Sequence, residues 1–363
     1  MIRLRAWLLT CCLLLLPGIG AADNLRTLGY VAWWLPDSWR TLALEKFDRL
    51  LFFDLVFDAS GDINQRHGWP EAWGELRASA LLAQTPIDLT LTCTDVEIFN
   101  RVFSSPAAIE RLLQQTLALT AGNGVAGLQL DVEVYQNARP PAITAFREFA
   151  RALSQGLRGM APARKLSAFV PMGAEVDIYD SATLALTDLV IMQGYDSHWI
   201  TGPQAGPVAP LHGPEAVTWE KALARGLALG VPRERLVLSY PLYGYEWPVK
   251  TAMSRSATTG KGAQVMFGRA AAAAERETKI DLQERVKKYG AHHDPQSASS
   301  SYRYQGADGL LYEGWFEDWW SLSRKIDFLN AEAAGGIAFF ALGYDDGALV
   351  EHWLRRRGPR ASQ

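Results

Sequence analysis

Eight short apolar runs that alternate with helical patterns constrain the fold of this chain more than any other feature. The runs are almost continuously apolar, which is typical of parallel strands buried on both faces. Parallel strands that alternate with helices form right-handed β–α–β units. The predicted strands are Gly29–Trp34, Leu50–Phe57, Ile87–Cys93, Gly127–Glu133, Lys165–Pro171, Leu189–Tyr195, Arg235–Leu242 and Gly336–Leu342.

The connections between these strands carry helix start and stop signals. Ser105 and Pro106 begin one helix and Gly122 ends it. Eight strands in 363 residues favour a closed (β/α)8 TIM barrel over an open doubly wound sheet, because no Gly-rich phosphate turn follows the first strand. The predicted helices are Pro106–Ala121, Pro141–Leu157, Pro214–Leu229 and Glu317–Ala333.

One segment breaks the alternation, between the seventh strand and the helix that precedes the eighth. Residues 247–315 are too many for a structureless loop in a compact domain. A helical pattern covers Ala270–Lys288, and strand-like pieces follow at Tyr302–Tyr304 and Leu310–Tyr312. We therefore expect a small α+β insertion on the rim of the barrel, in which Ser297–Ser301 forms a loop.

The N-terminus has the pattern of an export signal. Arg3 and Arg5 precede an apolar run, Ala6–Leu16, and small residues at Gly20–Ala22 offer a cleavage site. The run is shorter than the ~20 residues of a membrane-spanning helix. We predict a signal peptide at 1–22, a mature chain at 23–363, and a periplasmic or secreted protein with no membrane contact after cleavage. An uncleaved membrane anchor is the alternative.

Charge and cysteine content exclude several classes of function. The net charge of −3 provides no strong field for nucleic acid. Cys93 is the single cysteine of the predicted mature chain, so an internal disulfide is impossible, and its apolar strand predicts a buried thiol. No His, Cys or Asp cluster has metal-site spacing, and the adjacent His292 and His293 fit a solvated loop. We expect no metal and no cofactor.

The fourth predicted strand carries the strongest chemical signal. Polar side chains occupy every second position, which places Gln129, Asp131 and Glu133 on one face. Acids on a buried strand are costly unless they are paired or functional. Barrel enzymes also place their catalytic groups at the carboxyl ends of the strands. The pattern indicates a catalytic site; a solvated strand edge is the alternative.

This segment resembles the fourth-strand signature of glycoside hydrolase family 18, the chitinase family, Asp-Gly-x-Asp-x-Asp-x-Glu. Asp131 and Glu133 match the signature, whereas Ala126 and Gln129 replace its first two Asp residues. Other segments are similar to family motifs in the same order along the chain. They are Gly29-Tyr30, Gln193-Gly194-Tyr195-Asp196 with Gln in the Met position, Tyr240–Gly244, Trp315–Asp318 with Ser321 and Lys325, and Gly335–Phe340 with Phe340 where many chitinases have Trp.

The resemblance identifies the chain as a divergent member of this family and implies a substrate-assisted retaining mechanism. Glu133 is expected to protonate the glycosidic oxygen, and Asp131 to orient the N-acetyl group of the substrate. Tyr195 and Asp196 are expected to form a hydrogen-bonding pair that binds this acetamido group. The implied catalytic residues are Glu133, Asp131, Tyr195 and Asp196, and the implied substrate-binding residues are Tyr30, Gln129, Gln193, Tyr243, Phe340 and Trp199.

Tryptophans near strand ends and rim loops offer further candidates for sugar stacking. Core or loop packing is an equally good interpretation of any one of them, and His198 could bind a substrate hydroxyl or belong to a plain loop. These tryptophans are Trp33, Trp34, Trp199, Trp247 and Trp315.

We therefore expect a monomeric, exported hydrolase of β-linked N-acetylhexosamine glycans, whose partner is a polysaccharide or oligosaccharide. Chitin oligomers, peptidoglycan and an exopolysaccharide remain open as substrates. A non-catalytic glycan-binding barrel with a degenerate active site is the alternative, since Gln129 can neither carry the charge of an acid nor share its proton.

Overall fold

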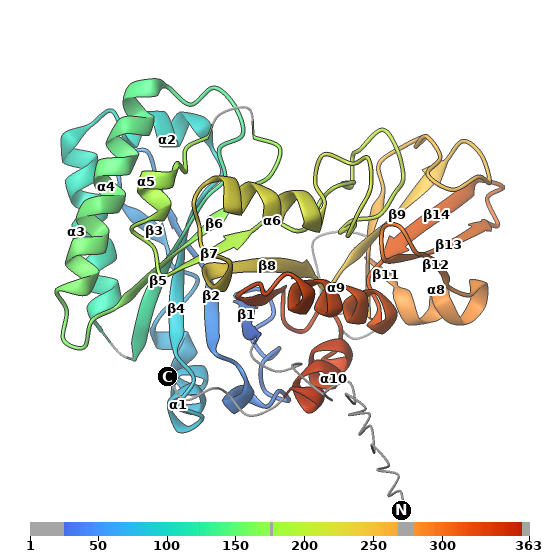
Figure 1. Ribbon diagram of the computed structural model, residues 1–363, viewed down its shortest axis with the longest axis horizontal. Coiled ribbons are helices and arrows are strands. Elements are labelled where there is room, and N and C mark those ends of the chain that lie inside the picture. Colours follow the sequence, from blue (N-terminus) through green and yellow to red (C-terminus); the bar gives the residue numbers. More distant parts are fainter. Residues whose placement is uncertain (1–24, 123, 175–176, 268–278, 358–363) are drawn as a thin grey trace, which may run out of the picture.

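The computed structural model describes residues 25–122, 124–174, 177–267 and 279–357. Eight parallel strands form a closed barrel, because β1 pairs with both β2 and β15 (Figure 1). The predicted (β/α)8 TIM barrel and all eight predicted strands are confirmed. The barrel strands are β1 (Arg26–Ala32), β2 (Arg49–Phe57), β4 (Ile87–Cys93), β5 (Val125–Val132), β6 (Lys165–Val170), β7 (Leu189–Met192), β8 (Leu236–Pro241) and β15 (Gly336–Phe340).

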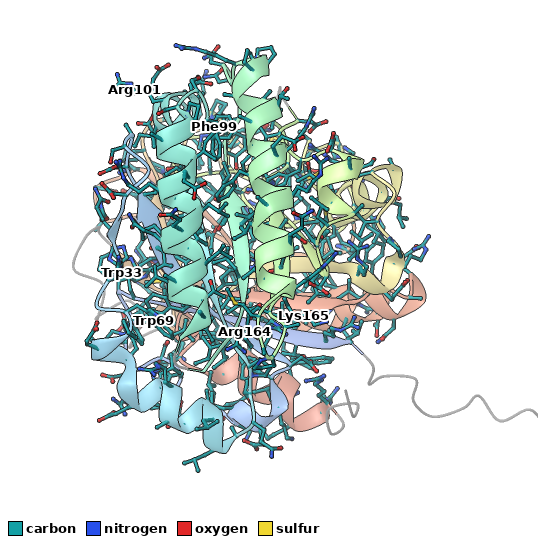
Figure 2. The ribbon with its side chains drawn as sticks, turned by 90° about the vertical axis from the view of Figure 1, so that its left-hand side faces the viewer. Trp33, Trp69, Phe99, Arg101, Arg164 and Lys165 are labelled. Atoms are coloured by element: carbon teal, nitrogen blue, oxygen red, sulfur yellow. The ribbon has the colours of Figure 1, made fainter. Side chains whose placement is uncertain are left out.

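Helices occupy the connections and cover the outside of the barrel. Figure 2 shows two long helices side by side, with Phe99 toward one end of the barrel and Arg164 and Lys165 at the other, where β6 begins. The helices are α1 (Gly74–Leu82), α2 (Val96–Val102), α3 (Pro106–Ala121), α4 (Pro140–Arg158), α5 (Ser181–Leu184), α6 (Trp219–Ala228), α9 (Trp319–Ala331) and α10 (Ala348–Arg356), with 3-10 turns at Leu44–Lys46, Glu71–Trp73 and Arg233–Arg235.

Side-chain caps set where these helices begin. Ser105 accepts a hydrogen bond from the backbone of Ala108, and Pro106 occupies the first turn, as predicted for α3. Thr218 accepts from the backbone of Lys221, so α6 begins at Trp219 and the prediction of a helix from Pro214 was wrong. Asp318 caps α9 in the same way, which moves its start two residues beyond the predicted Glu317.

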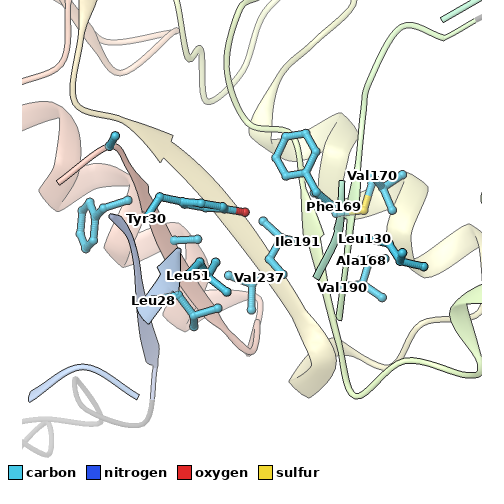
Figure 3. Close-up of a cluster of buried hydrophobic side chains, with 14 of the residues drawn as sticks. Leu28, Tyr30, Leu51, Leu130, Ala168, Phe169, Val170, Val190, Ile191 and Val237 are labelled. Atoms are coloured by element: carbon cyan, nitrogen blue, oxygen red, sulfur yellow. The ribbon is translucent and has the colours of Figure 1, made fainter. Parts of the chain in front are cut away.

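The interior of the barrel combines an apolar layer with a polar strip on β5. Gly127 is required there, because a Cβ atom at this position would lie 2.6 Å from Oδ1 of Asp88 and from the carbonyl oxygen of Lys165. The outward side chains of Leu128, Leu130 and Val132 are fully buried under the helices. Figure 3 shows Tyr30 in a buried hydrophobic cluster that draws side chains from several strands of the barrel, among them Leu28, Leu51, Ile191 and Val237.

A second sheet of six strands lies between β8 and β15 in the chain and to one side of the barrel (Figure 1). Together with α8 it forms the predicted α+β insertion. Its elements are β9 (Gly244–Val249), β10 (Ala263–Met266), β11 (Lys279–Asp281), α8 (Leu282–Tyr289), β12 (His292–Asp294), β13 (Ser299–Gln305) and β14 (Leu311–Phe316); the short β3 (Ile63–Gln65) pairs instead with β2.

Three local predictions for this segment need correction. Ser299–Ser301 is strand rather than loop. Ser299 and Ser300 can be buried there because they donate hydrogen bonds to Glu317 and Asp318. His292 and His293 belong to β12. The predicted helix Ala270–Lys288 is confirmed only from Leu282, since Asp281 caps α8 and residues 279–281 are strand; residues 270–278 lie outside the described part of the chain.

The insertion is joined to the barrel helix α9 by a buried ion pair. Nζ of Lys325 lies 2.7 Å from Oε2 of Glu317 and also donates to Ser321 and to the carbonyl oxygen of Ala298. Both charged side chains are completely buried. Burial raises the pKa of Glu317 and lowers the pKa of Lys325, while the partner opposes the shift in each case.

The predicted signal peptide lies outside the described residues. Within the ranges that the structure describes, no helix has the length and apolarity needed to cross a membrane. Cys93 is buried as predicted, and burial raises the pKa of its thiol to about 12.

Candidate active site

A cavity of about 190 Å³ opens at the carboxyl end of the barrel strands. This volume is below the ~300–1,000 Å³ of a drug-sized pocket, so the cavity encloses a small group or a single ring. Eight of its lining residues come from the predicted site, and three do not. The predicted eight are Tyr30, Asp131, Glu133, Gln193, Tyr195, Asp196, Tyr243 and Phe340, and the others are Phe53, Tyr135 and Phe169.

The two acids of β5 point into this cavity from one strand. The backbone N–H of Glu133 donates to the carbonyl oxygen of Cys93 at 2.8 Å, which continues the pairing of β5 with β4 past Val132. Glu133 therefore keeps the inward direction of Asp131. Burial, followed by the charge of Glu133, raises the pKa of Asp131 well above its usual range. Burial also raises the pKa of Glu133 to about 7.

The surroundings of Asp131 are polar but incompletely paired. Gln129 lies below it on the same face, fully buried, and its Oε1 accepts from the hydroxyl of Thr90 at 3.3 Å. Among the described residues, Oδ1 of Asp131 and Nε2 of Gln129 have no hydrogen-bond partner. Unpaired buried groups at an active site are available to a ligand or to water.

Asp196 faces the two acids from the loop after β7. Its φ of 59° is in the left-handed region, which Asp tolerates better than most residues. Oδ1 accepts hydrogen bonds from Tyr243 at 2.8 Å and Tyr245 at 3.3 Å. Burial raises the pKa of Asp196, and these two hydrogen bonds lower it. The tyrosines that bind Asp196 directly are thus Tyr243 and Tyr245.

Aromatic rings form the apolar part of the cavity. The Phe340 ring lies 5.4 Å from Tyr30, 5.3 Å from Phe53 and 5.9 Å from Tyr195, measured between centroids. Tyr195 also packs edge-on against Tyr243 at 6.0 Å. A lining that combines rings and polar groups suits a sugar, which has an apolar face and a polar edge.

Several predicted residues lie outside this cavity. Trp199 is 49% exposed on the loop after β7 and is not among the lining residues, and Gln129 lies beneath the lining. The Nδ1–H group of His198 donates to the carbonyl oxygen of Pro207 at 3.0 Å, in keeping with a loop role. Trp247 and Trp315 are buried in the second sheet, which decides their interpretation in favour of packing.

Trp33 and Trp34 lie at the end of β1. Trp33 stacks on His67 with centroids 4.1 Å apart, and the indole nitrogen of Trp34 donates to the hydroxyl of Tyr344. Neither ring lines the cavity.

The sequence prediction missed a fourth acid beside the site. Asp54, within β2, accepts from the hydroxyl of Thr92 at 2.6 Å, and Nε2 of His67 lies 3.3 Å from its other oxygen. Its charge raises the pKa of Asp131. The signal was present, because an acid inside an apolar strand is the same anomaly that identified Asp131.

Metal ligation has no candidate in the part of the chain that the structure covers. No group of three or more His, Cys, Asp or Glu side chains there is placed to hold a metal ion.

Comparisons with known proteins place this geometry in a family. The sequence model of Glycosyl hydrolases family 18 matches residues 93–345. A Bacillus subtilis (strain 168) protein, YdhD, named as a sporulation-specific glycosylase, is 26% identical over 310 residues, or 83% of this chain. The cortical fragment-lytic enzyme of the same organism is 25% identical over 248 residues, or 67% of this chain. The chain spans 65% of the first relative and 52% of the second.

Solved structures share the fold. The spore cortex-lytic enzyme SleL of Bacillus cereus superposes with a TM-score of 0.74 at 17% identity, over 95% of this chain and 76% of SleL. A chitinase of Cycas revoluta in complex with allosamidin gives a TM-score of 0.74 at 19% identity, over 91% of this chain and 98% of the chitinase. With the family model covering more than half of its length, the chain belongs to glycoside hydrolase family 18.

Proposed function

We propose that this protein is an exported glycoside hydrolase that cleaves β-linked N-acetylhexosamine glycans with a substrate-assisted retaining mechanism. One observation carries the proposal. Asp131 and Glu133 face the same 190 Å³ cavity from one strand, together with Asp196 and a set of aromatic rings. Perturbed acids in a small cleft at the carboxyl end of barrel strands are typical of a catalytic site.

Glu133 acts as the general acid in this mechanism. Burial keeps its carboxyl protonated up to a pH of about 7, which matches the requirement of an acid that works near neutral pH. It donates its proton to the glycosidic oxygen as the bond to the anomeric carbon breaks. In the second half of the reaction it accepts a proton from the water that attacks the same carbon.

The nucleophile in the first half is the carbonyl oxygen of the substrate's own N-acetyl group. Asp131 orients the amide N–H through its unpaired Oδ1, and in its ionised form it stabilises the positive charge of the cyclic intermediate. Tyr195 and Asp196 line the same cavity from the end of β7, where they bind the acetamido group. An attack within the bound substrate gains the rate advantage of a near-unimolecular step.

The names of the relatives support an amino-sugar substrate. One sequence relative is named a cortical fragment-lytic enzyme, and one solved structure is that of a spore cortex-lytic enzyme. The Cycas revoluta chitinase was also solved in complex with (GlcNAc)3. Peptidoglycan fragments and chitin oligomers both contain β-linked N-acetylglucosamine. We place peptidoglycan fragments first, because the relatives named for cortex come from both the sequence and the structure comparisons.

The test is incubation of purified mature protein with chitin oligomers, peptidoglycan fragments and a partly acetylated exopolysaccharide, followed by mass spectrometry of the products. Release of fragments with N-acetylhexosamine at the new reducing end supports the proposal. Binding of these glycans without cleavage at any pH from 4 to 9 would instead support the non-catalytic alternative. Intact mass of the exported protein tests the cleavage after residue 22.

A further inference from the structure

Tyr135 contacts the side chain of Glu133 directly. Its hydroxyl donates to Oε2 of Glu133 at 2.9 Å, and the ring lines the cavity while remaining 39% exposed. Within the described residues, no other hydrogen bond reaches this carboxyl group. Tyr135 follows Glu133 by two residues and lies beyond the end of β5, so the strand pattern does not fix its direction.

A second side chain, Gln193, lines the cavity beside Tyr135 from the end of β7. Oε1 of Gln193 accepts from the backbone N–H of Met172 at 2.7 Å, which turns the amide so that Nε2 is the free donor. Gln193 and Tyr135 line the same cavity, and Gln193 lowers the pKa of the Tyr135 hydroxyl, as a donor to its oxygen would. The series Met172, Gln193, Tyr135 and Glu133 therefore links the ends of β6, β7 and β5. A methionine at position 193 could not donate this bond.

We propose that Tyr135 is a positioning residue for Glu133: its hydroxyl holds Oε2 and leaves Oε1 as the oxygen that exchanges the proton with the glycosidic oxygen and with water. This inference rests on the proposed function and adds a residue to it. When the proton leaves Oε1, the bond from Tyr135 stabilises the carboxylate, and the same bond keeps the carboxyl plane fixed in both halves of the reaction. Gln193 supports this arrangement by fixing the hydroxyl of Tyr135.

The test is a ¹³C NMR titration of the Glu133 carboxyl carbon, assigned with Glu133→Gln. Tyr135→Phe removes the hydroxyl that stabilises the Glu133 carboxylate, so the pKa of Glu133 in this variant should rise by roughly one unit. The matched control is Tyr312→Phe, whose hydroxyl binds Asp308 outside the cavity, and here the titration should not move. An unchanged Glu133 titration in folded Tyr135→Phe would overturn the proposal.

Gln193→Met supplies an independent variant if Tyr135→Phe fails to fold. It should shift the Glu133 titration in the same direction by a smaller amount. The double variant should shift it no further than Tyr135→Phe alone, because the two residues act through one contact. A shift of the opposite sign, or additive shifts, would also contradict the proposal.

Enzyme kinetics add a readout that a merely structural role would leave unchanged. On a cleavable glycan, Tyr135→Phe should move the basic limb of the kcat/KM profile to higher pH together with the NMR titration. The titration needs no substrate, so it remains decisive if the wild-type protein cleaves none of the glycans. Absence of cleavage would refute the proposed function, whereas the titration would still test the contact between Tyr135 and Glu133.

Discussion

The hydroxyl of Tyr243 donates a 2.8 Å hydrogen bond to Oδ1 of Asp196. Tyr243 follows β8 and Asp196 follows β7, so the bond ties together two adjacent strand ends. A carboxylate oxygen that already accepts from Tyr243 and Tyr245 is a weak nucleophile and a well-oriented hydrogen-bond acceptor. The arrangement supports a role for Asp196 in binding the substrate amide rather than in covalent catalysis.

Replacing the proposed acid should remove activity without unfolding the protein. In Glu133→Gln the turnover on a cleavable glycan should fall by about 10²–10⁴, the contribution of general acid catalysis. The amide is nearly isosteric and can still accept from Tyr135, so the melting temperature and the glycan affinity should change little. Kinetics, thermal unfolding and calorimetric titration with an oligosaccharide check the three expectations.

Glu97→Gln is the matched control for this variant. Glu97 is an exposed acid on α2, and its ion pair with Arg139 at 3.8 Å is exposed on both sides. Its replacement should leave turnover unchanged. Wild-type turnover in Glu133→Gln would show that another group protonates the glycosidic oxygen.

The pH dependence of activity follows from the direction of the Glu133 shift. Burial raises its pKa to about 7, and the protonated form is the active acid. kcat/KM should therefore fall as the pH rises through about 7, at least one unit above where an ordinary carboxyl group would have lost its proton. A pH–rate profile from 4 to 9 checks this, and an activity that is constant from pH 5 to 9 would contradict it.

The same shift links stability to pH. The folded-state pKa of Glu133 lies above its unfolded value, so its contribution to stability is complete below the unfolded pKa and is lost as the pH rises through about 7. Urea unfolding should show a smaller decrease of stability between pH 5 and pH 8 in Glu133→Gln than in the wild type. Equal decreases would show that the buried carboxyl is not protonated in the folded protein.

The buried ion pair under the insertion should be essential for stability. In Lys325→Met, the carboxylate of Glu317 loses its charge partner in a fully buried environment. Removing one member of such a pair costs about 3–5 kcal/mol of unfolding free energy. The control is Lys165→Met, an exposed side chain whose partner Asp188 lies 3.3 Å away and whose loss should cost less than ~1 kcal/mol. Urea unfolding that shows equal small effects would contradict this expectation.

The sequence was sufficient for the barrel and for the acids of β5, because both depend on local periodicity. A period of two on a buried strand makes Asp131 and Glu133 visible without any tertiary information. The structure brings them to one cavity with Tyr195 and Asp196, as the motif order implied.

Contacts that cross between elements could not be predicted in this way. Tyr135 and Tyr245 reach Glu133 and Asp196 from positions outside the strand pattern. Ser299 and Ser300 looked like solvated residues, and only their bonds to Glu317 and Asp318 explain why they are buried in β13. Secondary-structure propensity gives no information about contacts between elements, since it depends on the residue and its neighbours in sequence.

The proposed mechanism makes an N-acetyl group beside the cleaved bond a requirement. The acids that line the cavity are Asp131, Glu133 and Asp196. Asp131 and Glu133 share one face of one strand and approach the bond from the same side, and Asp196 is held by two tyrosine hydroxyls. The remaining walls are aromatic rings and an amide, so among the described residues no carboxylate of the lining is left to attack the anomeric carbon from the opposite side.

A carbonyl oxygen of the substrate solves this geometry, since it attacks from within the bound sugar. A thiazoline analogue of N-acetylglucosamine mimics the cyclic intermediate and should inhibit competitively, and fully de-N-acetylated polymer should not be cleaved. Initial rates on matched acetylated and de-N-acetylated polymers, with and without the thiazoline, test both statements. If the two polymers are cut at the same rate and the thiazoline has no effect, the nucleophile must come from the protein or from water, and the roles given to Asp131 and Asp196 are wrong.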